Sequence, residues 1–190
     1  MRKLIYLFSL FVLILVFYFF FSSEEYYIPK PKALIKIELP DAKTSLFEDK
    51  KISFRYSNSS HVIVRNNFYK IIYPNYFSDI YFKLKSSTDL DLELYNFENS
   101  ISVHEKQGAD INANIISDEE NSIFGVLCFL DGVNIATSSQ FFLTDSVDNL
   151  IIGGLNFNRS ISSEIEAQNV IMKQEILKFI ESLYWINEDL

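Results

Sequence analysis

Residues 122–144 read SIFGVLCFLDGVNIATSSQFFLT, and this stretch decides the fold. Two apolar runs, 122–130 and 133–144, flank the dipeptide Asp131-Gly132. Asp-Gly between such runs is a strong short-range signal for a β-hairpin, because both residues tolerate the positive φ angles of a two-residue turn. The stretch therefore predicts two neighbouring antiparallel strands.

Shorter runs of the same character lie on both sides of this stretch. They are rich in β-branched and aromatic residues, several alternate with polar residues, and turn residues such as Pro40-Asp41 and Pro74-Asn75 separate them. The further predicted strands are 34–39, 52–56, 61–65, 68–73, 78–85, 111–117 and 150–157.

Two segments carry apolar residues at helical spacing. The first, 88–105, follows the capping sequence Ser87-Thr88-Asp89, and the second runs from about 162 to 185. Two helices are too few for a doubly wound parallel sheet. We expect an α+β fold, in which a mostly antiparallel sheet carries two packed helices, one mid-chain and one C-terminal, behind an N-terminal membrane segment.

The N-terminal segment Leu4–Phe21 contains 18 residues and no charge. As a helix it would span about 27 Å, close to the thickness of a bilayer's hydrocarbon core. Arg2 and Lys3 precede it, so the positive-inside rule predicts a cytoplasmic N-terminus and a domain outside. A retained transmembrane anchor is favoured over a cleaved signal peptide, because Phe20 and Phe21 stand where a cleavage site needs small residues.

The chain then divides into three parts. Residues 1–23 are the anchor or signal segment, and residues 24–33 are a spacer that contains Pro29-Lys30-Pro31-Lys32 and favours an extended conformation. Residues 34–190 are long enough for one domain with a substantial core.

Composition excludes several classes of function. The net charge is −8, and without Arg2 and Lys3 the remainder carries −8 − 2 = −10. An acidic domain with no basic stripe interleaved with aromatic residues argues against nucleic acid as a partner. Cys128 is the sole cysteine, so neither an internal disulfide nor a multi-cysteine metal cluster can form, and its apolar surroundings predict a buried, inert thiol.

A search for catalytic motifs finds none. His61 and His104 are far apart in the sequence and match no metal-binding or catalytic spacing. Nucleophile-elbow and phosphate-loop patterns are absent. Asp118-Glu119-Glu120 is predicted to be a charged turn, and loose calcium binding there is the less favoured alternative. Asp145-Ser146-Val147 fits an O-glycan acceptor of exported bacterial proteins, and an Asx turn at a strand end explains it as well. We therefore expect no catalytic residue, no metal and no cofactor, which favours a binding protein over an enzyme.

Several stretches, in order along the chain, resemble the gliding-motility lipoprotein family GldD. They include the spacer, Ile71–Pro74, the segment after the first helix, the hairpin region and the closing helix with its late tryptophan. The matching positions are Pro29, Lys30, Pro31, Lys32, Tyr73, Pro74, Gly108, Ala109, Asp110, Gly125, Gly132, Asn134, Ala136, Gln140, Phe141, Thr144, Asp145, Ser146 and Trp185.

This resemblance implies an exported, membrane-anchored cell-envelope protein with its domain in the periplasm. It implies protein–protein contacts with the gliding and secretion machinery and no enzymatic activity. The composition leaves an alternative, a periplasmic domain that binds a small molecule or lipid in an aromatic-lined pocket. One departure matters: Ser23 occupies the position of the family's lipobox cysteine, and serine cannot form the thioether to a lipid. The long apolar segment is expected to take over anchoring.

Overall fold

The computed structural model describes residues 2–21, 39, 43–132, 136–158 and 165–186. The chain forms two compact units, Met1–Lys36 and Ile37–Leu190. The predicted spacer 24–33 and nearly all of the predicted strand 34–39 lie outside the described residues. The predicted division of the chain at residues 23 and 33 therefore stays a prediction.

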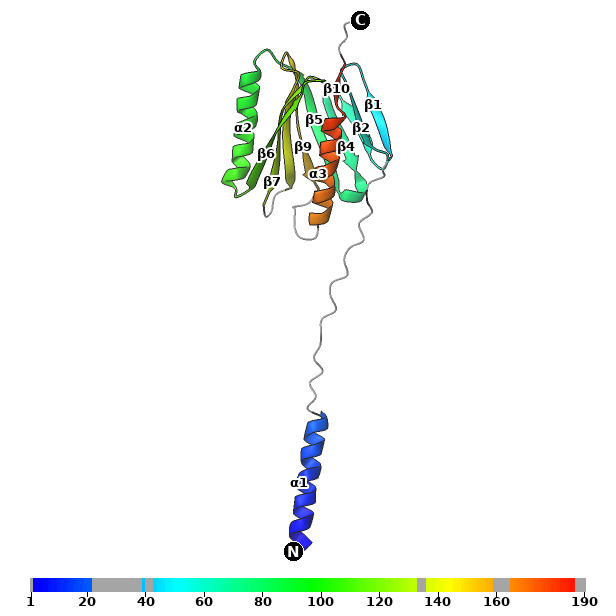
Figure 1. Ribbon diagram of the computed structural model, residues 1–190, viewed down its shortest axis with the longest axis vertical. Coiled ribbons are helices and arrows are strands. Elements are labelled where there is room, and N and C mark those ends of the chain that lie inside the picture. Colours follow the sequence, from blue (N-terminus) through cyan, green and yellow to red (C-terminus); the bar gives the residue numbers. More distant parts are fainter. Residues whose placement is uncertain (1, 22–38, 40–42, 133–135, 159–164, 187–190) are drawn as a thin grey trace. The chain divides into compact units, whose positions relative to one another are not determined.

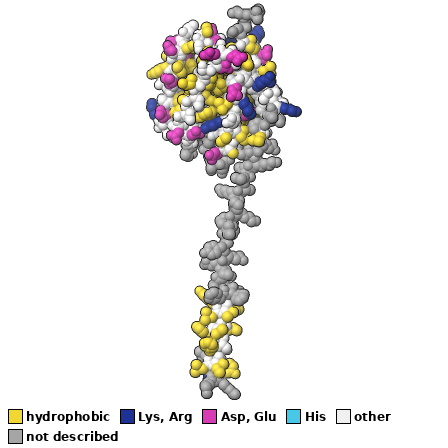
Figure 2. Space-filling view, in the orientation of Figure 1, with side chains coloured by type: hydrophobic (Ala, Val, Ile, Leu, Met, Phe, Trp, Pro, Cys, Tyr) yellow, Lys and Arg dark blue, Asp and Glu magenta, His cyan; other side chains and the backbone are white. Residues whose placement is uncertain are grey.

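The first unit contains helix α1, Arg2–Phe21. Its described side chains are almost all hydrophobic and exposed, as Figure 2 shows. Among the residues whose placement is described, however, no helix is found to be both long and apolar enough to cross a membrane. The predicted helix is present, and its predicted role as a membrane span is not supported by this finding.

The second unit is built on a seven-stranded sheet with the strand order β3-β4-β5-β9-β8-β7-β6 (Figure 1). All neighbouring strands pair antiparallel, which confirms the predicted sheet type. The strands are β3 (His61–Arg65), β4 (Phe68–Tyr73), β5 (Ser78–Ser86), β6 (Asp110–Asp118), β7 (Ile123–Asp131), β8 (Thr137–Thr144) and β9 (Asn149–Phe157). A short 3₁₀ helix, η1 (Pro74–Tyr76), joins β4 to β5.

A second, three-stranded sheet has the order β1-β2-β10 and consists of β1 (Thr44–Glu48), β2 (Ile52–Ser57) and β10 (Tyr184–Trp185). Strand β1 was not predicted from the sequence, because the five residues of this strand show little apolar alternation. Tertiary contacts stabilise it instead: Phe47 pairs with Phe54 of β2, and their rings stack 4.9 Å apart.

Helix α3 (Glu166–Glu181) joins the two sheets. The ring of Phe179 lies 5.2 Å from Phe54 of β2, 5.1 Å from Phe82 of β5 and 5.8 Å from Phe141 of β8. All four side chains are almost fully buried. They form the centre of the main hydrophobic core, which confirms that the C-terminal helix packs on the sheet.

Helix α2 (Leu90–Lys106) packs on the opposite face of the same sheet. Its residue Phe97 contacts Phe142, with the ring centroids 5.8 Å apart, whereas the preceding residue Phe141 contacts α3. Successive side chains of a strand point to opposite faces, so α2 and α3 cover opposite sides. As predicted, Asp89 caps α2, and its side chain accepts a hydrogen bond from the backbone N–H of Leu92 at 3.0 Å.

The predicted two-residue turn at Asp131-Gly132 is wrong, although β7 and β8 do pair antiparallel. Their pairing reaches only Phe129 opposite Ser139, and β7 continues to Asp131 before β8 begins at Thr137. Asp131 instead extends β7 against Asp110 of β6, and it forms a 2.6 Å ion pair with Lys173 of α3. These two partners hold Asp131 in the strand and keep it out of a tight turn.

The predicted closing helix is too long at its C-terminal end. α3 ends at Glu181, and Trp185 belongs to β10, opposite Ile52 of β2. The Ser182 hydroxyl accepts a hydrogen bond from the backbone N–H of Arg55 at 3.0 Å, which ties the end of the helix to β2. Pairing with β2 therefore replaces a further helical turn.

We predict that Phe179→Ala lowers the free energy of unfolding by about 3–5 kcal/mol, because it leaves a cavity between three buried aromatic rings. Urea denaturation followed by circular dichroism measures the change. Val170→Ala is the matched control, since Val170 lies on the same helix and is 57% exposed. A loss for Phe179→Ala no larger than that of the control would contradict this description of the core.

Candidate functional site

The two histidines do not form a reactive pair. His61 is exposed on β3, whereas His104 lies near the end of α2, where its Nε2 is 3.0 Å from Nε2 of Gln140. Among the described residues, no group of three His, Cys, Asp or Glu side chains is placed to hold a metal ion. Cys128 is buried, as predicted, and burial raises the pKa of its thiol.

The first group of family-matching positions builds the turn between α2 and β6. Gly108 adopts φ +91°, a value that favours glycine, and Ala109 is buried next to it. Gly132 approaches the same turn, because a Cβ at this position would lie 3.3 Å from the Cα of Ala109. Asp110 then begins β6. These residues allow two segments of backbone to pass close to each other.

A second group lies in β7 and β8, and one of its members, Gln140, links the sheet to α2. Gly125 adopts φ +150°, and a Cβ there would lie 1.9 Å from the backbone oxygen of Phe142. The Ser100 hydroxyl donates to the side-chain oxygen of Gln140 at 3.2 Å, which links α2 to β8. Phe141 belongs to the main core. The positions have structural roles in strand packing and helix attachment.

The turn between β8 and β9 contains Thr144, Asp145 and Ser146. Oδ1 of Asp145 accepts hydrogen bonds from the backbone N–H groups of Val147, Asp148 and Asn149 at 2.8–3.1 Å. The Thr144 hydroxyl donates to the backbone oxygen of Asn149 at 2.7 Å, and Ser146 adopts φ +64°. The predicted Asx turn is confirmed, and the carboxylate is occupied by its own turn.

Trp185 lies beside this turn and the β6–β7 turn. Its Nε1 donates to the backbone oxygen of Ser122 at 3.0 Å. An open pocket of about 480 Å³ lies at this end of the domain, and its lining residues are Glu120, Asn121, Ser122, Asp145, Val147, Tyr184 and Trp185. The sequence predicted the charged turn but not its approach to Trp185, which depends on β10.

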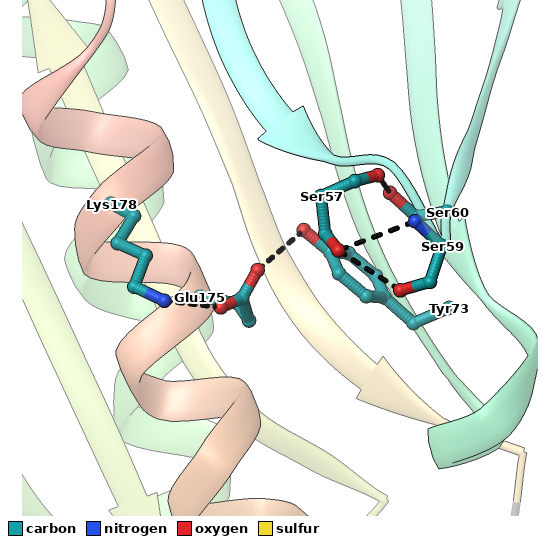
Figure 3. A network of polar contacts seen from close by, with 6 residues as sticks. All are labelled: Ser57, Ser59, Ser60, Tyr73, Glu175 and Lys178. Atoms are coloured by element: carbon teal, nitrogen blue, oxygen red, sulfur yellow. Dashed lines mark hydrogen bonds and ion pairs between the residues drawn. The ribbon is translucent and has the colours of Figure 1, made fainter. Parts of the chain in front are cut away.

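Tyr73 belongs to a buried polar network (Figure 3). Its hydroxyl donates to Oε2 of Glu175 at 3.5 Å, and Oε1 of Glu175 accepts from Lys178 at 2.7 Å. Burial and the neighbouring Glu175 carboxylate raise the pKa of Tyr73, so its phenol stays protonated and available as a donor. This network connects α3 to the end of β4, where Pro74 begins η1.

Of the other positions predicted to match the family, only Ala136 is described, through a backbone contact. The backbone oxygen of Ala136 accepts a hydrogen bond from the N–H of Phe157 at 2.8 Å. Asn134, Pro29–Lys32 and Ser23 lie outside the described residues.

A different surface emerges from the strand register. In β4 and β5, every second side chain, such as those of Tyr69 and Phe82, is buried in the core that α3 contacts, and the alternate side chains face the other way. β3 follows the same alternation through its register with β4, but all of its side chains are exposed or half-buried. Helix α2 contacts the sheet around Phe142, Cys128 and Leu150, so among the described residues no helix covers the part of the opposite face that β3, β4 and the middle of β5 form. We call it the open face; it consists of His61, Ile63, Arg65, Phe68, Lys70, Ile72, Tyr81 and Lys83.

The open face is basic and aromatic, whereas the whole chain is acidic. It presents Arg65, Lys70 and Lys83; Asp79, which lies opposite Ile72, is buried and forms a 3.0 Å ion pair with Lys70. The sequence contains no basic stripe along the chain, and this local group of cations does not alter the expectation that nucleic acid is not a partner. These residues come from three strands, and only the pairing of the strands shows that they share one surface.

Comparison with known proteins finds a family to which this chain is similar. A family model, described as gliding motility lipoprotein GldD, matches residues 24–185. The chain belongs to this family. No curated protein and no solved structure matches it. The match begins directly after Ser23.

Membership of the GldD family implies a role in gliding motility and a membrane-anchored location in the cell envelope. Members of this family are gliding lipoproteins, and the family is not known for enzymatic activity. The resemblance found in the sequence is thereby confirmed. The positions predicted to match the family, where they are described, mainly stabilise turns and helix contacts, and the open face contains none of them.

Proposed function

We propose that this GldD-family protein is a non-catalytic component of the cell envelope that supports gliding motility and the associated protein secretion through contacts with other proteins. The family match over residues 24–185 carries the proposal. The protein acts as an assembly or positioning partner, and its domain faces the periplasm.

Surface features of the domain support a binding role. The open face combines exposed apolar residues, such as Ile63 and Phe68, with cations. Both β3 and β6 are edge strands of the large sheet, and edge strands present unpaired backbone groups to other chains. The described residues therefore offer a sheet face and two edges for protein contacts.

The alternative, a pocket for a small molecule or lipid, receives less support. The aromatic side chains that were expected to line such a pocket contact one another instead. The rings of Tyr69 and Phe82 stack 4.8 Å apart, and Phe179 fills the space between the sheets. The pocket near Trp185 is open and lined mainly by polar turn residues, unlike an enclosed apolar site.

The anchor is the second part of the proposal. The uncharged segment Leu4–Phe21 stays attached and tethers the domain to the inner membrane, because Ser23 provides no thiol for lipidation. Support for this mode of anchoring comes from the sequence, whereas the family supports a membrane-anchored location in general.

We predict that deletion of the gene abolishes or strongly reduces surface spreading and lowers the amount of secreted adhesin. Both effects should be restored by the wild-type gene on a plasmid. Colony spreading and quantitative mass spectrometry of the culture medium measure them. In a non-motile host, secretion is the relevant readout. Unchanged spreading and secretion in the deletion strain would refute the proposed role.

We predict that the mature protein keeps its N-terminal segment and carries no lipid. N-terminal sequencing and intact-mass measurement of protein purified from membranes test this directly. A mature chain that begins at Ser22, Ser23 or Glu24 would rule out the retained anchor. A Ser23→Cys variant is the informative comparison, because it restores the residue that lipidation requires and is expected to add the mass of a lipid modification.

A further inference from the structure

We propose that the open face and its edge strand β3 bind an extended, acidic segment of a partner protein. This inference rests on the proposed function, since it specifies the partner chemistry for the same domain. Four features of the described residues support it: the arrangement of the cations, the aromatic pair between them, the local charge balance and the free strand edge.

Two cations lie in one row across the sheet. Arg65 pairs with Phe68 of β4, and Phe68 pairs with Lys83 of β5. Neighbouring strands are about 4.8 Å apart, so the Cα atoms of Arg65 and Lys83 are separated by roughly 10 Å. All three side chains are exposed on the same face. The row thus presents positive charge on both sides of an aromatic ring.

The aromatic surface continues onto the next row. The rings of Phe68 and Tyr81 stack with centroids 6.4 Å apart and an interplanar angle of 24°. Phe68 is 42% exposed, and Ile63 beside it is 40% exposed. Tyrosine and arginine, which this surface provides in Tyr81 and Arg65, are enriched among the residues that contribute most to protein–protein binding.

The basic side chains on this side of the sheet differ in whether a carboxylate of the same chain already pairs with them. Lys70 is paired with the buried Asp79 at 3.0 Å, and Lys85, further along β5, is paired with Glu93 of α2 at 3.0 Å. Within the described part of the chain, no carboxylate forms an ion pair with Arg65 or Lys83. These two side chains are free to bind carboxylates of a partner.

The net charge of −8 opposes an acidic partner at long range. At physiological ionic strength, however, charges more than about 8 Å apart are largely screened. Local pairing with Arg65 and Lys83 then dominates over the distant acidic residues.

The edge strand favours a polypeptide as the occupant. β3 is the first strand of the seven-stranded sheet and pairs only with β4 among the described residues. A peptide added beside β3 would hydrogen-bond to its outer backbone groups. Every second peptide side chain would then face the same way as His61, Ile63 and Arg65. Acidic residues at alternate positions would meet this basic surface.

The charges argue against a lipid surface. Electrostatic recognition of anionic membranes typically uses clusters of 4–8 basic residues. Only two of the cations considered, Arg65 and Lys83, lack an ion pair among the described residues. A membrane also provides no strand to pair with β3.

The other edge of the sheet, β6, serves as an internal comparison. It begins with Asp110, ends with Asp118 and is followed by Glu119 and Glu120. Carboxylates at both ends of β6 would repel an acidic strand. The two edges therefore differ in the charge of the segment that they accept, and β3 is the edge suited to an acidic one.

The test uses the full chain in neutral detergent micelles and a fluorescent nine-residue peptide in which glutamate alternates with threonine. Fluorescence anisotropy measures binding, and hydrogen exchange locates it. We expect that the peptide binds, that added salt weakens the binding, and that bound peptide slows backbone amide hydrogen exchange at His61–Arg65.

The variant Arg65→Glu/Lys83→Glu should bind the peptide at least about tenfold more weakly than the wild type. Its matched control, Lys43→Glu/Lys50→Glu, carries the same charge change at exposed positions elsewhere and should bind like the wild type.

Three results would overturn the inference. The first is no binding of the glutamate peptide, or equal binding of a peptide with lysine in place of glutamate. The second is an unchanged affinity of the Arg65→Glu/Lys83→Glu variant for the glutamate peptide, provided that circular dichroism shows this variant to be folded. If the variant is unfolded, Arg65→Gln/Lys83→Gln is tested in its place. The third is protection of β3–β5 by nanodiscs containing phosphatidylglycerol and not by the peptide, which would assign the face to a lipid surface. Peptide binding is measured in vitro and the motility role by gene deletion, so either can fail without the other.

Discussion

The contact of Phe179 with Phe54, Phe82 and Phe141 is the constraint on which the rest of the domain depends. It packs α3 against both sheets and determines which face of the seven-stranded sheet is buried. Because Phe142 must then point the other way, it becomes the contact for α2. The apolar cluster under α2 draws on β6–β9, and on the same face Arg65, Phe68 and Lys83 of β3–β5 remain exposed.

The sequence predicted most strands and both helices of the domain, because their apolar spacing is a local property. Its errors concern tertiary contacts. β1 depends on Phe54 for its stability, Asp131 is drawn into β7 by β6 and Lys173, and Trp185 pairs with β2. The open face was missed for the same reason, since Arg65, Phe68 and Lys83 become neighbours only through the strand register.

In this protein, the residues predicted to match the family and the residues of the proposed binding surface are different sets. Positions predicted to match the GldD family, such as Gly125, Gly132 and Asp145, allow close backbone approach or complete a turn, so their roles in the structure are in the fold. The surface proposed for partner binding is recognised instead by charge and exposure. Its cations stand out because the chain as a whole is acidic. A domain of this kind can contribute to a motility apparatus by holding another protein, with no chemical step of its own.

The central claim is that the open face is the surface through which this domain takes part in gliding. The most direct measurement replaces the chromosomal gene by the Arg65→Glu/Lys83→Glu variant and compares gliding speed of single cells with that of the Lys43→Glu/Lys50→Glu strain. At equal protein levels, the account predicts that cells with the altered open face stop gliding, whereas control cells move like the wild type. Normal gliding of both strains would contradict it.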